Sequence, residues 1–287
     1  MDNVIRYGLH PFMFVWAIAL CYLIPDLNLA TLVAVISTHV ILRLCENIYP
    51  YNRQWRQSVS DIWAIIAITL LGLVVIGFVT VLYDENLGSL FAITRQSFGV
   101  DLWPSRLPFI IQIFLVYFVS EFLFYWIHRA IHTFGMIWRI SGHGMHHSFH
   151  NLHAINFLTA HPFEILFLLL PIQVVSFFLG APEQALLGGS LLLTVNSAFA
   201  HANIDVRSTL LGYFFTSPEH HRLHHSMNFA DSNSNYSCNA IIFDRLFGTY
   251  KAGRVEQTGI GPTEPSSWQK LMLPLQEPED KTASPIK

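Results

Sequence analysis

Long runs of apolar residues alternate with short polar breaks along the first two hundred positions of the chain. A helix that crosses the hydrocarbon core of a membrane needs about 20 consecutive apolar residues. Four runs reach this length, at residues 59–82, 107–127, 162–181 and 184–202. Two shorter runs, at residues 10–25 and 28–44, are separated by Pro25, Asp26 and Asn28. The pattern predicts an all-α integral membrane bundle of four to six spans, whose two short runs form a hairpin that crosses fully or in part.

The distribution of basic residues predicts which way this bundle faces. With six spans, the loop before residue 59, the segment 128–160 and everything after residue 200 lie on one side together with the N-terminus. That side or its edge holds all sixteen Lys and Arg residues except Arg95 and Arg106. Because loops rich in Lys and Arg stay in the cytoplasm, this side is predicted to be cytoplasmic. The orientation does not depend on whether the first hairpin crosses, since a hairpin adds two crossings or none.

The composition is that of a protein partly surrounded by lipid, and it argues against a nucleic-acid-binding or disulfide-rich protein. Hydrophobic residues make up 52% of the 287 positions and charged residues only 12%, and the mean hydropathy is +0.42. A formal charge of −3 leaves no basic excess for nucleic acid. The three cysteines lack CxxC spacing and predict neither a disulfide framework nor a thiolate metal site. We divide the chain into an N-terminal membrane hairpin (1–45), a main membrane domain (46–250) and a polar, solvated C-terminal tail (251–287).

Histidine is the unusual residue of this sequence, because thirteen of the fifteen histidines lie between residues 128 and 225. The motif HRAIH at 128–132 spaces two of them four residues apart. HGMHH at 143–147 and HRLHH at 221–225 each place three at i, i+3 and i+4. Residues at these spacings share one face of a helix, so each motif presents its imidazoles toward a common point. Neutral imidazole is a ligand for Zn, Cu, Fe and Ni, so the three motifs predict metal binding.

Eight imidazoles exceed the need of a single ion, so a pair of metal ions is the economical interpretation. His201, at the inner end of the last predicted span, is a ninth candidate, because an ionisable group there should face the protein rather than lipid. A lone HxxxH pair is usually a chance surface pair, but so many unpartnered imidazoles beside membrane spans would be poor core material. Four further histidines are predicted to orient ligands or to be structural: His150, His153, His161 and His220.

The order of these motifs resembles the fatty acid hydroxylase and sterol desaturase superfamily of non-haem di-iron membrane enzymes. The resemblance covers residues 46–250 and includes ENIYPYNRQWRQSVSDIW at 46–63, HPFE at 161–164, HANI at 201–204, TSPEHHRLHHS at 216–226 and FDRLFGTY at 243–250. It implies that residues 46–250 form the catalytic domain and that the metal ligands are His128, His132, His143, His146, His147, His201, His221, His224 and His225. Relatives usually read Asp-x-Asn-Tyr-Gly where this chain has Asn233-Ser234-Asn235-Tyr236-Ser237. The resemblance further implies that two ferrous ions bind O2 and that the enzyme attacks an unactivated C–H bond.

Several carboxylates are candidates for supporting roles. Glu121 lies within the predicted span 107–127, seven residues before His128, and is a catalytic candidate because acids at that depth are functional by default. Its alternative is a hydrogen bond to Ser120 or Tyr125. Asp205, Glu219, Asp231 and Asp244 either orient histidine rings or are solvated loop carboxylates and helix caps. The sequence has no Rossmann glycine motif, CxxCH haem motif or ferredoxin cysteine set, so an external partner must supply electrons.

Four functions remain to be compared. An O2-dependent lipid hydroxylase is the first, and a desaturase of the same superfamily is the second, since the motifs do not distinguish the two. A membrane metal transporter should place ligands near mid-bilayer, whereas these motifs stand at helix ends on one side. A zinc hydrolase would ordinarily use three protein ligands rather than nine. The substrate stays open among fatty acyl chains, sterols or hopanoids, alkylglycerol ethers, carotenoids and aminolipids.

Overall fold

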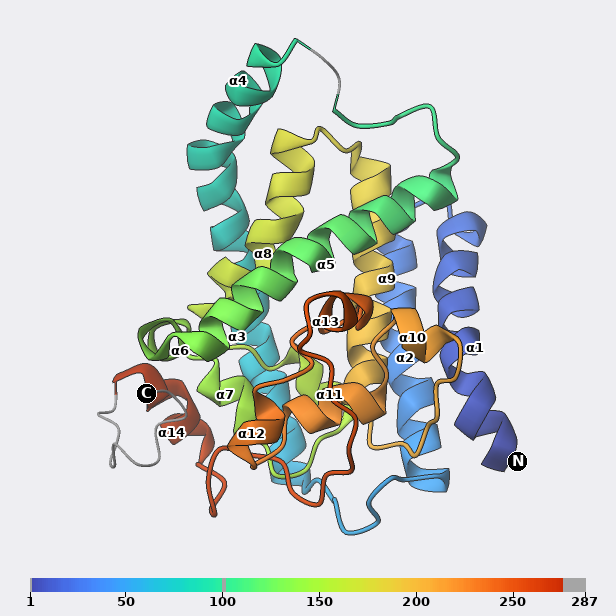
Figure 1. Ribbon diagram of the computed structural model, residues 1–287, viewed down its shortest axis with the longest axis vertical. Coiled ribbons are helices and arrows are strands. Elements are labelled where there is room, and N and C mark those ends of the chain that lie inside the picture. The colour runs from blue at the N-terminus through green and yellow to red at the C-terminus, as the bar shows by residue number, and fades with distance from the viewer. Residues whose placement is uncertain (1, 100–101, 276–287) are drawn as a thin grey trace.

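The protein is a bundle of long helices with many short helices gathered at one end (Figure 1). The computed structural model describes residues 2–99 and 102–275, and within these ranges no β-strand is formed. The longer helices are α1 (Asp2–Leu23), α2 (Leu27–Ile48), α3 (Val59–Tyr83), α4 (Ser89–Ser97), α5 (Phe109–Thr133), α8 (Glu164–Gln173) and α9 (Glu183–His201). Two π-helical turns, η1 (Asp84–Gly88) and η3 (Val174–Phe178), join α3 to α4 and lengthen α8. The all-α prediction is confirmed.

The polar breaks in the sequence are the places where helices begin. The Asp26 carboxylate caps α2 by accepting hydrogen bonds from the backbone N–H groups of Asn28 (2.9 Å) and Leu29 (3.2 Å). Ser58 caps α3, because its hydroxyl accepts from the Asp61 N–H while the Asp61 carboxylate accepts from the Ser58 N–H. Such caps satisfy backbone donors that the first helical turn leaves free. Short polar segments therefore separate helices without weakening them.

Among the residues that the structure describes, four helical segments are long and apolar enough to cross a membrane: Asn3–Leu23, Leu27–Ile48, Val59–Ser97 and Phe109–Thr133. The prediction of a membrane bundle is confirmed, and the spans at 59–82 and 107–127 are found where expected. The first hairpin is longer than its apolar runs, because α1 and α2 extend over polar residues such as Arg6 and Glu46 near their ends.

The predicted spans at 162–181 and 184–202 differ from the structure. The first forms an apolar helix only over Glu164–Phe178, which is shorter than a full span. The second, α9, has 19 residues but carries Asn196 within it and His201 at its end, so it is not among the four membrane-length apolar helices. These segments lie between other helices, where apolar sequence reflects contact with protein rather than with lipid.

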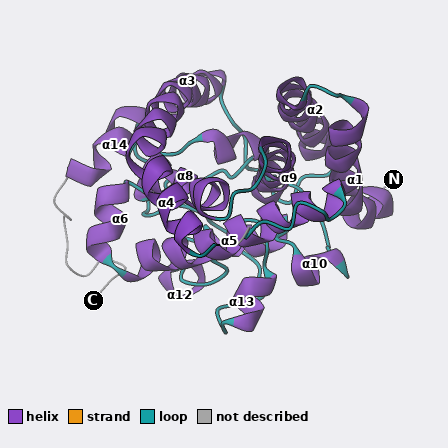
Figure 2. Cartoon of the chain, turned by 90° about the horizontal axis from the view of Figure 1, so that it is seen from above, coloured by secondary structure: helices purple, strands orange, loops and turns teal. Residues whose placement is uncertain are grey.

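The helix α9 is the centre of the bundle and packs against α1, α2 and α5 (Figure 2). Two glycines allow α5 to approach it closely. A Cβ atom at Gly189 would lie 2.4 Å from Cγ1 of Val116, and one at Gly188 would lie 2.8 Å from Cγ1 of Ile113. Both helices end at the same end of the bundle, so the close crossing brings His132 and His201 to one region.

Replacing Gly189 by alanine is expected to destabilise the protein, because the added methyl group overlaps Val116 and the backbone oxygen of Ile113. Overpacking of this kind costs about 1–3 kcal/mol. Gly77→Ala in α3 is the matched control, since a Cβ there meets nothing within 4 Å and alanine favours helix. Thermal unfolding of the two variants in detergent should give a lower Tm for Gly189→Ala only. Equal Tm values would contradict the close-packing account.

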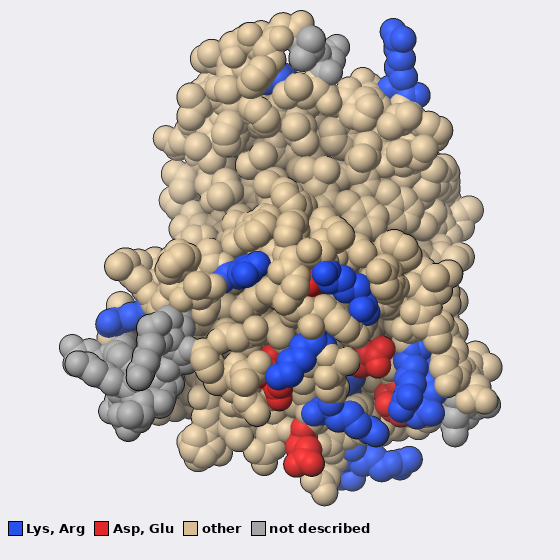
Figure 3. Space-filling view, in the orientation of Figure 1, with Lys and Arg blue, Asp and Glu red and all other residues tan. Residues whose placement is uncertain are grey.

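The short helices form a cap over one end of the long helices (Figure 1). They are α6 (Gly135–Ser141), α7 (Gly144–His147), η2 (Ala154–Leu158), α10 (Leu211–Phe214), α11 (Pro218–His224), α12 (Phe229–Ser232), α13 (Ile242–Leu246), α14 (Ser267–Met272) and η4 (Leu273–Leu275). Charged residues gather over this capped end, whereas the opposite half of the visible face is almost free of them (Figure 3). The charge distribution is that of a bundle whose uncapped half lies in lipid.

The segment expected to be a solvated tail is folded as far as residue 275. The helix α14 packs on α7, and η4 packs on α6. The Arg139 Nε donates to the Pro274 carbonyl (2.9 Å), and Lys270 is buried beside Glu264. The segment has many charged residues, so its sequence did not indicate that one side of the short helix α14 is apolar. Residues 276–287 lie outside the described residues, and the proposed boundaries at 45 and 250 stay predictions.

Candidate metal centre

All nine histidines predicted as ligands converge beneath the bundle, in two adjacent groups. His128 and His132 come from the last turns of α5, and His201 is the last residue of α9. The other six come from the cap, on or next to α7 and α11. The first group is His128, His132, His143, His147 and His224, and the second is His146, His201, His221 and His225. Within each group the candidate ligand atoms all lie within 4.8 Å of one another.

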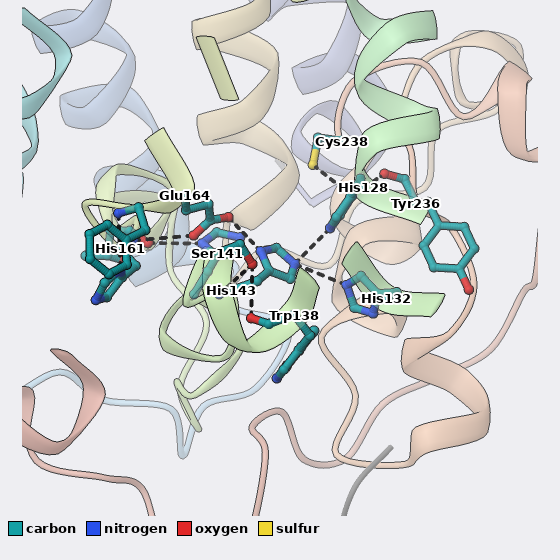
Figure 4. A network of polar contacts seen from close by, with 12 residues as sticks. His128, His132, Trp138, Ser141, His143, His161, Glu164, Tyr236 and Cys238 are labelled. Atoms are coloured by element: carbon teal, nitrogen blue, oxygen red, sulfur yellow. Dashed lines mark hydrogen bonds and ion pairs between the residues drawn. The ribbon is translucent and has the colours of Figure 1, made fainter. Parts of the chain in front are cut away.

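The Nε2 atoms of the five-histidine group point at a common space. His128 Nε2 lies 2.9 Å from that of His143 and 3.2 Å from that of His224. His143 Nε2 is also 3.1 Å from His132 Nε2 (Figure 4). The His147 ring stands beside this set, with its centroid 4.7 Å from that of His224. Five imidazoles from three separate segments therefore surround one small volume.

The four-histidine group has a similar arrangement and lies directly beside the five-histidine group. His201 Nε2 lies 3.2 Å from His146 Nε2 and 3.0 Å from His221 Nε2. His225 Nε2 lies 3.1 Å from His221 Nε2. The two groups touch through His147 and His225, whose rings stack with centroids 4.3 Å apart. The arrangement is that of two neighbouring sites rather than one large site.

Hydrogen bonds at Nδ1, the other ring nitrogen, determine whether Nε2 carries a proton or a free lone pair. The Nδ1 of His128 lies 2.5 Å from the Tyr236 carbonyl, and that of His224 lies 2.8 Å from the Ser234 carbonyl. His146 and His201 bond through Nδ1 to the carbonyls of Thr159 and Ser197 in the same way. A carbonyl oxygen only accepts, so each Nδ1 must hold the proton. In a neutral ring the Nε2 then presents a lone pair.

Lone pairs that face one another at these distances repel unless a cation lies between them. Burial lowers the pKa of His143 to about 3 and that of His225 well below its ordinary value, so protons do not supply that positive charge near neutral pH. Two imidazole nitrogens bound to one ion at about 2.1 Å and a right angle would be about 3.0 Å apart. The observed separations match that spacing, so the residues fit two metal ions with nitrogen ligands.

Glu164 supports this centre and was not predicted. Its Oε1 lies 2.6 Å from Nδ1 of His143, and both side chains are buried (Figure 4). A carboxylate behind a metal-binding histidine fixes the ring orientation and raises the basicity of the ligand nitrogen. The sequence signal was the HPFE motif, in which this acid begins α8 three residues after His161.

Glu121 is buried close to the centre, but its carboxylate makes no hydrogen bond to Ser120 or Tyr125, the alternatives that the sequence suggested. Its Oε1 accepts a hydrogen bond from the Asn239 N–H (2.7 Å), and its Oε2 accepts one from the Asn239 side-chain amide (3.1 Å). The chain just before Asn239 carries Tyr236, whose carbonyl accepts from His128. Glu121 thus anchors a loop that orients a ring of the five-histidine group.

The four other acids do not contact the nine rings. Asp205 pairs with Arg6, Asp231 pairs with Lys251, and Glu219 accepts from the backbone N–H of Ser208 (3.4 Å). Asp244 accepts from the backbone N–H groups of Tyr236 (2.7 Å) and Ser237 (2.9 Å), so it holds the same loop as Glu121. The remaining clustered histidines, His150, His153, His161 and His220, lie outside both groups.

Comparison with known proteins agrees with this geometry. Residues 113–249 match the fatty acid hydroxylase family. The chain is also 31% identical over 235 residues to the ornithine lipid hydroxylase OlsE of Rhizobium tropici, covering 80% of this chain and 70% of that protein. The chain belongs to the fatty acid hydroxylase family. The matched segment of this hydroxylase family member begins in α5 and includes all nine clustered ligand candidates.

Two other relatives are less similar to the chain. The chain is 29% identical over 137 residues to the alkylglycerol monooxygenase of Caenorhabditis elegans, covering 48% of this chain and 26% of that protein. It is 27% identical over 162 residues to methylsterol monooxygenase 2-2 of Arabidopsis thaliana, covering 56% of this chain and 59% of that protein. No solved structure matches the chain significantly. The fatty acid hydroxylase family is therefore represented among these relatives by proteins named for different lipids.

A cavity of about 360 Å³ extends from the clustered histidines into the bundle. His143, His146 and His201 line it at the centre, and Glu121 and Cys238 stand on its wall. Its other walls are mainly apolar side chains of α3, α8 and α9, including Leu73, Ile76, Leu168, Leu169, Ile172 and Leu193. The cavity therefore joins the predicted ligands to a space suited to a hydrocarbon chain.

Proposed function

We propose that this member of the fatty acid hydroxylase family is an O2-dependent di-iron oxidoreductase that hydroxylates an unactivated C–H bond of a lipid. The observation that carries the proposal is the convergence of nine histidines at the inner end of an apolar cavity within the bundle. Two iron ions, one held by each group, would supply the activation of O2 that such a C–H bond requires. A metal-binding or metal-transport protein would have no need of an apolar cavity beside its ligands.

The residues of the chain have three tasks in this proposal. The nine imidazoles hold the ions. Carbonyl or Glu164 partners at Nδ1 keep Nε2 deprotonated and aimed inward in five of them: His128, His143, His146, His201 and His224. Glu121 is a positioning residue rather than a catalytic one, because it acts through the loop that ends at Asn239. The apolar walls bind the lipid chain and exclude bulk water from the reacting carbon.

We also propose an orientation and a source of electrons. The capped end, where the Lys and Arg residues gather, is assigned to the cytoplasm by the positive-inside rule. The centre then lies just beneath the cytoplasmic surface, within reach of a separate reducing partner. The names of the relatives, which include an ornithine lipid hydroxylase and an alkylglycerol monooxygenase, support a lipid substrate.

Mass spectrometry of lipids from cells with and without the protein tests the reaction. Hydroxylation adds one oxygen, a gain of 16 mass units, whereas the alternative desaturation removes two hydrogens. We expect lipids with the added oxygen only in cells that contain the wild-type chain, and only in the presence of O2. A loss of two mass units would assign the chain to desaturation, and unchanged lipids would contradict the proposal.

Filling the cavity should reduce oxidation without removing metal. Gly72 in α3 lines the cavity, and a Cβ there meets only Cδ1 of Ile165, at 3.8 Å. Gly72→Leu is expected to lower kcat/KM about tenfold or more for a long-chain lipid, because its side chain occupies space meant for substrate. Gly77→Leu, where a Cβ meets nothing within 4 Å, should retain activity. Equal activity of the two variants at equal metal content would show that this cavity does not hold the substrate.

A further inference from the structure

A second hollow, of about 390 Å³, lies on the capped end of the protein. We call it the arginine hollow. It is formed by the end of α2, the loop from α2 to α3, and two residues of the cap. Its lining residues are Arg43, Glu46, Asn47, Pro50, Asn52, Arg53, Trp55, Arg56, Gln57, His153 and Asn203. The size is within the range of about 300–1,000 Å³ that small-molecule sites occupy.

The hollow stands at the level where lipid head groups would lie. It is framed by Ile48, where α2 ends, and Val59, where α3 begins, and both helices are long and apolar enough to cross a membrane. Arg43 lies in the last turns of α2, and Arg53 and Arg56 lie in the loop between the two helices. All three arginines are exposed. Arginines at the ends of spanning helices place their charge at the membrane surface.

The charge of the hollow is positive and largely uncompensated. Glu46 is its single acidic lining residue, and that carboxylate is already engaged by the backbone N–H groups of Ala154 (2.8 Å) and Asn203 (3.0 Å). Within residues 2–99 and 102–275, the guanidinium groups of Arg53 and Arg56 have neither a carboxylate within 4 Å nor a hydrogen bond. Two free guanidinium groups at one hollow form a site for an anion such as phosphate or carboxylate.

A buried polar side chain in the hollow also lacks a partner. His153 is only 3% exposed, and its Nε2 makes no hydrogen bond within the described part of the chain. Its Nδ1 lies 3.2 Å from Oε2 of Glu46. A buried ring nitrogen without a partner is costly unless a ligand or water completes it. The wall of the hollow therefore contains a buried polar group next to the exposed charge at its rim.

One short helix separates this hollow from the cavity at the metal centre. His153 lines the hollow, while Phe157 and Leu158 of the following helix η2 line the cavity. Similarly, Asn203 lines the hollow and His201 lines the cavity. The helix η2 packs against both α2 and α3, so it bridges the gap between these two helices. A lipid that passes beside η2 could place its polar end in the hollow and its chain in the cavity.

We propose that the arginine hollow binds the anionic head group of the lipid whose chain enters the cavity. The substrate would then be a lipid with a phosphate or carboxylate group rather than a neutral sterol or hydrocarbon. This inference rests on the proposed function for its link to oxidation, but the binding itself can be measured separately. A concave site at head-group level suits a lipid head group. A partner protein would usually need a broader contact surface than this hollow provides.

Native mass spectrometry of the purified chain in neutral detergent provides the test, with phosphatidylglycerol and phosphatidylcholine as competing probes. We expect the wild-type chain to prefer the anionic phosphatidylglycerol, and Arg53→Gln/Arg56→Gln to lose that preference by about tenfold. Arg207→Gln/Arg254→Gln removes the same charge from two other exposed arginines and should keep the preference. Both double variants change only exposed side chains, so they should fold. This measurement detects binding and needs no enzyme activity. A failure to detect lipid oxidation would therefore not affect its result.

Three results would overturn the inference. An equal loss in both double variants would assign the effect to general surface charge. Complete displacement of phosphatidylglycerol by inorganic phosphate would identify a site for a free anion. Retained lipid binding in Arg53→Gln/Arg56→Gln, combined with lost reduction by an acidic one-electron donor protein, would assign the hollow to a protein partner.

Discussion

Replacing His224 or His146 by alanine is expected to remove metal from the protein and to abolish lipid oxidation. Each variant deletes one ligand from one group, and the remaining lone pairs no longer enclose an ion fully. Changes behind a ligand alone cost about 10- to 100-fold in affinity or activity, so loss of a ligand should exceed about 100-fold. Metal analysis after purification, together with lipid mass spectrometry, measures both effects.

His150→Ala is the matched control for these two variants. His150 lies in the same histidine-rich stretch of sequence, but it bonds through Nε2 to the Gly261 carbonyl (2.9 Å) and belongs to neither group. It should therefore retain both metal and oxidation. If His224→Ala kept the wild-type metal content, the ligand assignment for the five-histidine group would be wrong.

The second large effect is expected at Glu164, although this residue would touch no metal ion. Glu164→Ala leaves Nδ1 of the buried His143 without its acceptor, so the ring can turn or take the other tautomer. We expect metal affinity to fall about 10- to 100-fold. Glu164→Gln should be milder, because the amide oxygen can still accept from Nδ1. Titration with a competing chelator measures the affinity of each variant.

Glu183→Ala is the control for this experiment, since Glu183 is an exposed acid at the start of α9. A structural role of Glu164 alone would lower Tm and leave metal affinity unchanged. Such a result, or equal affinities of Glu164→Ala and Glu164→Gln, would contradict its role in orienting His143.

The grouping of the nine histidines could be predicted because the spacing within each motif is local. Imidazoles at i, i+3 and i+4 share a helix face whatever the rest of the fold does. Recognition of His201 needed one more fact, its place at the end of an apolar helix. The helical class likewise follows from apolar runs too long for a small soluble domain. These features depend on few residues, and the structure brings all nine histidines together.

The features that were missed depend on contacts between distant segments. Glu164 reaches His143 across 21 residues, and Glu46 reaches Ala154 across 108. Nothing in the neighbouring sequence of either acid predicts its partner. The two segments after residue 161 were predicted as spans for a related reason, since α9 is apolar for packing against α1, α2 and α5. Polar residues near the ends of α1 and α2 likewise made the helices of the first hairpin appear shorter in the sequence than they are.

The central claim is that two neighbouring iron ions occupy the two histidine groups, and the metal content of the purified wild-type chain tests it most directly. Protein produced in iron-supplied cells and kept from chelators should contain close to two iron ions per chain, one for each group. A reproducible content of one ion, of zinc alone, or of no metal in folded protein would contradict the account.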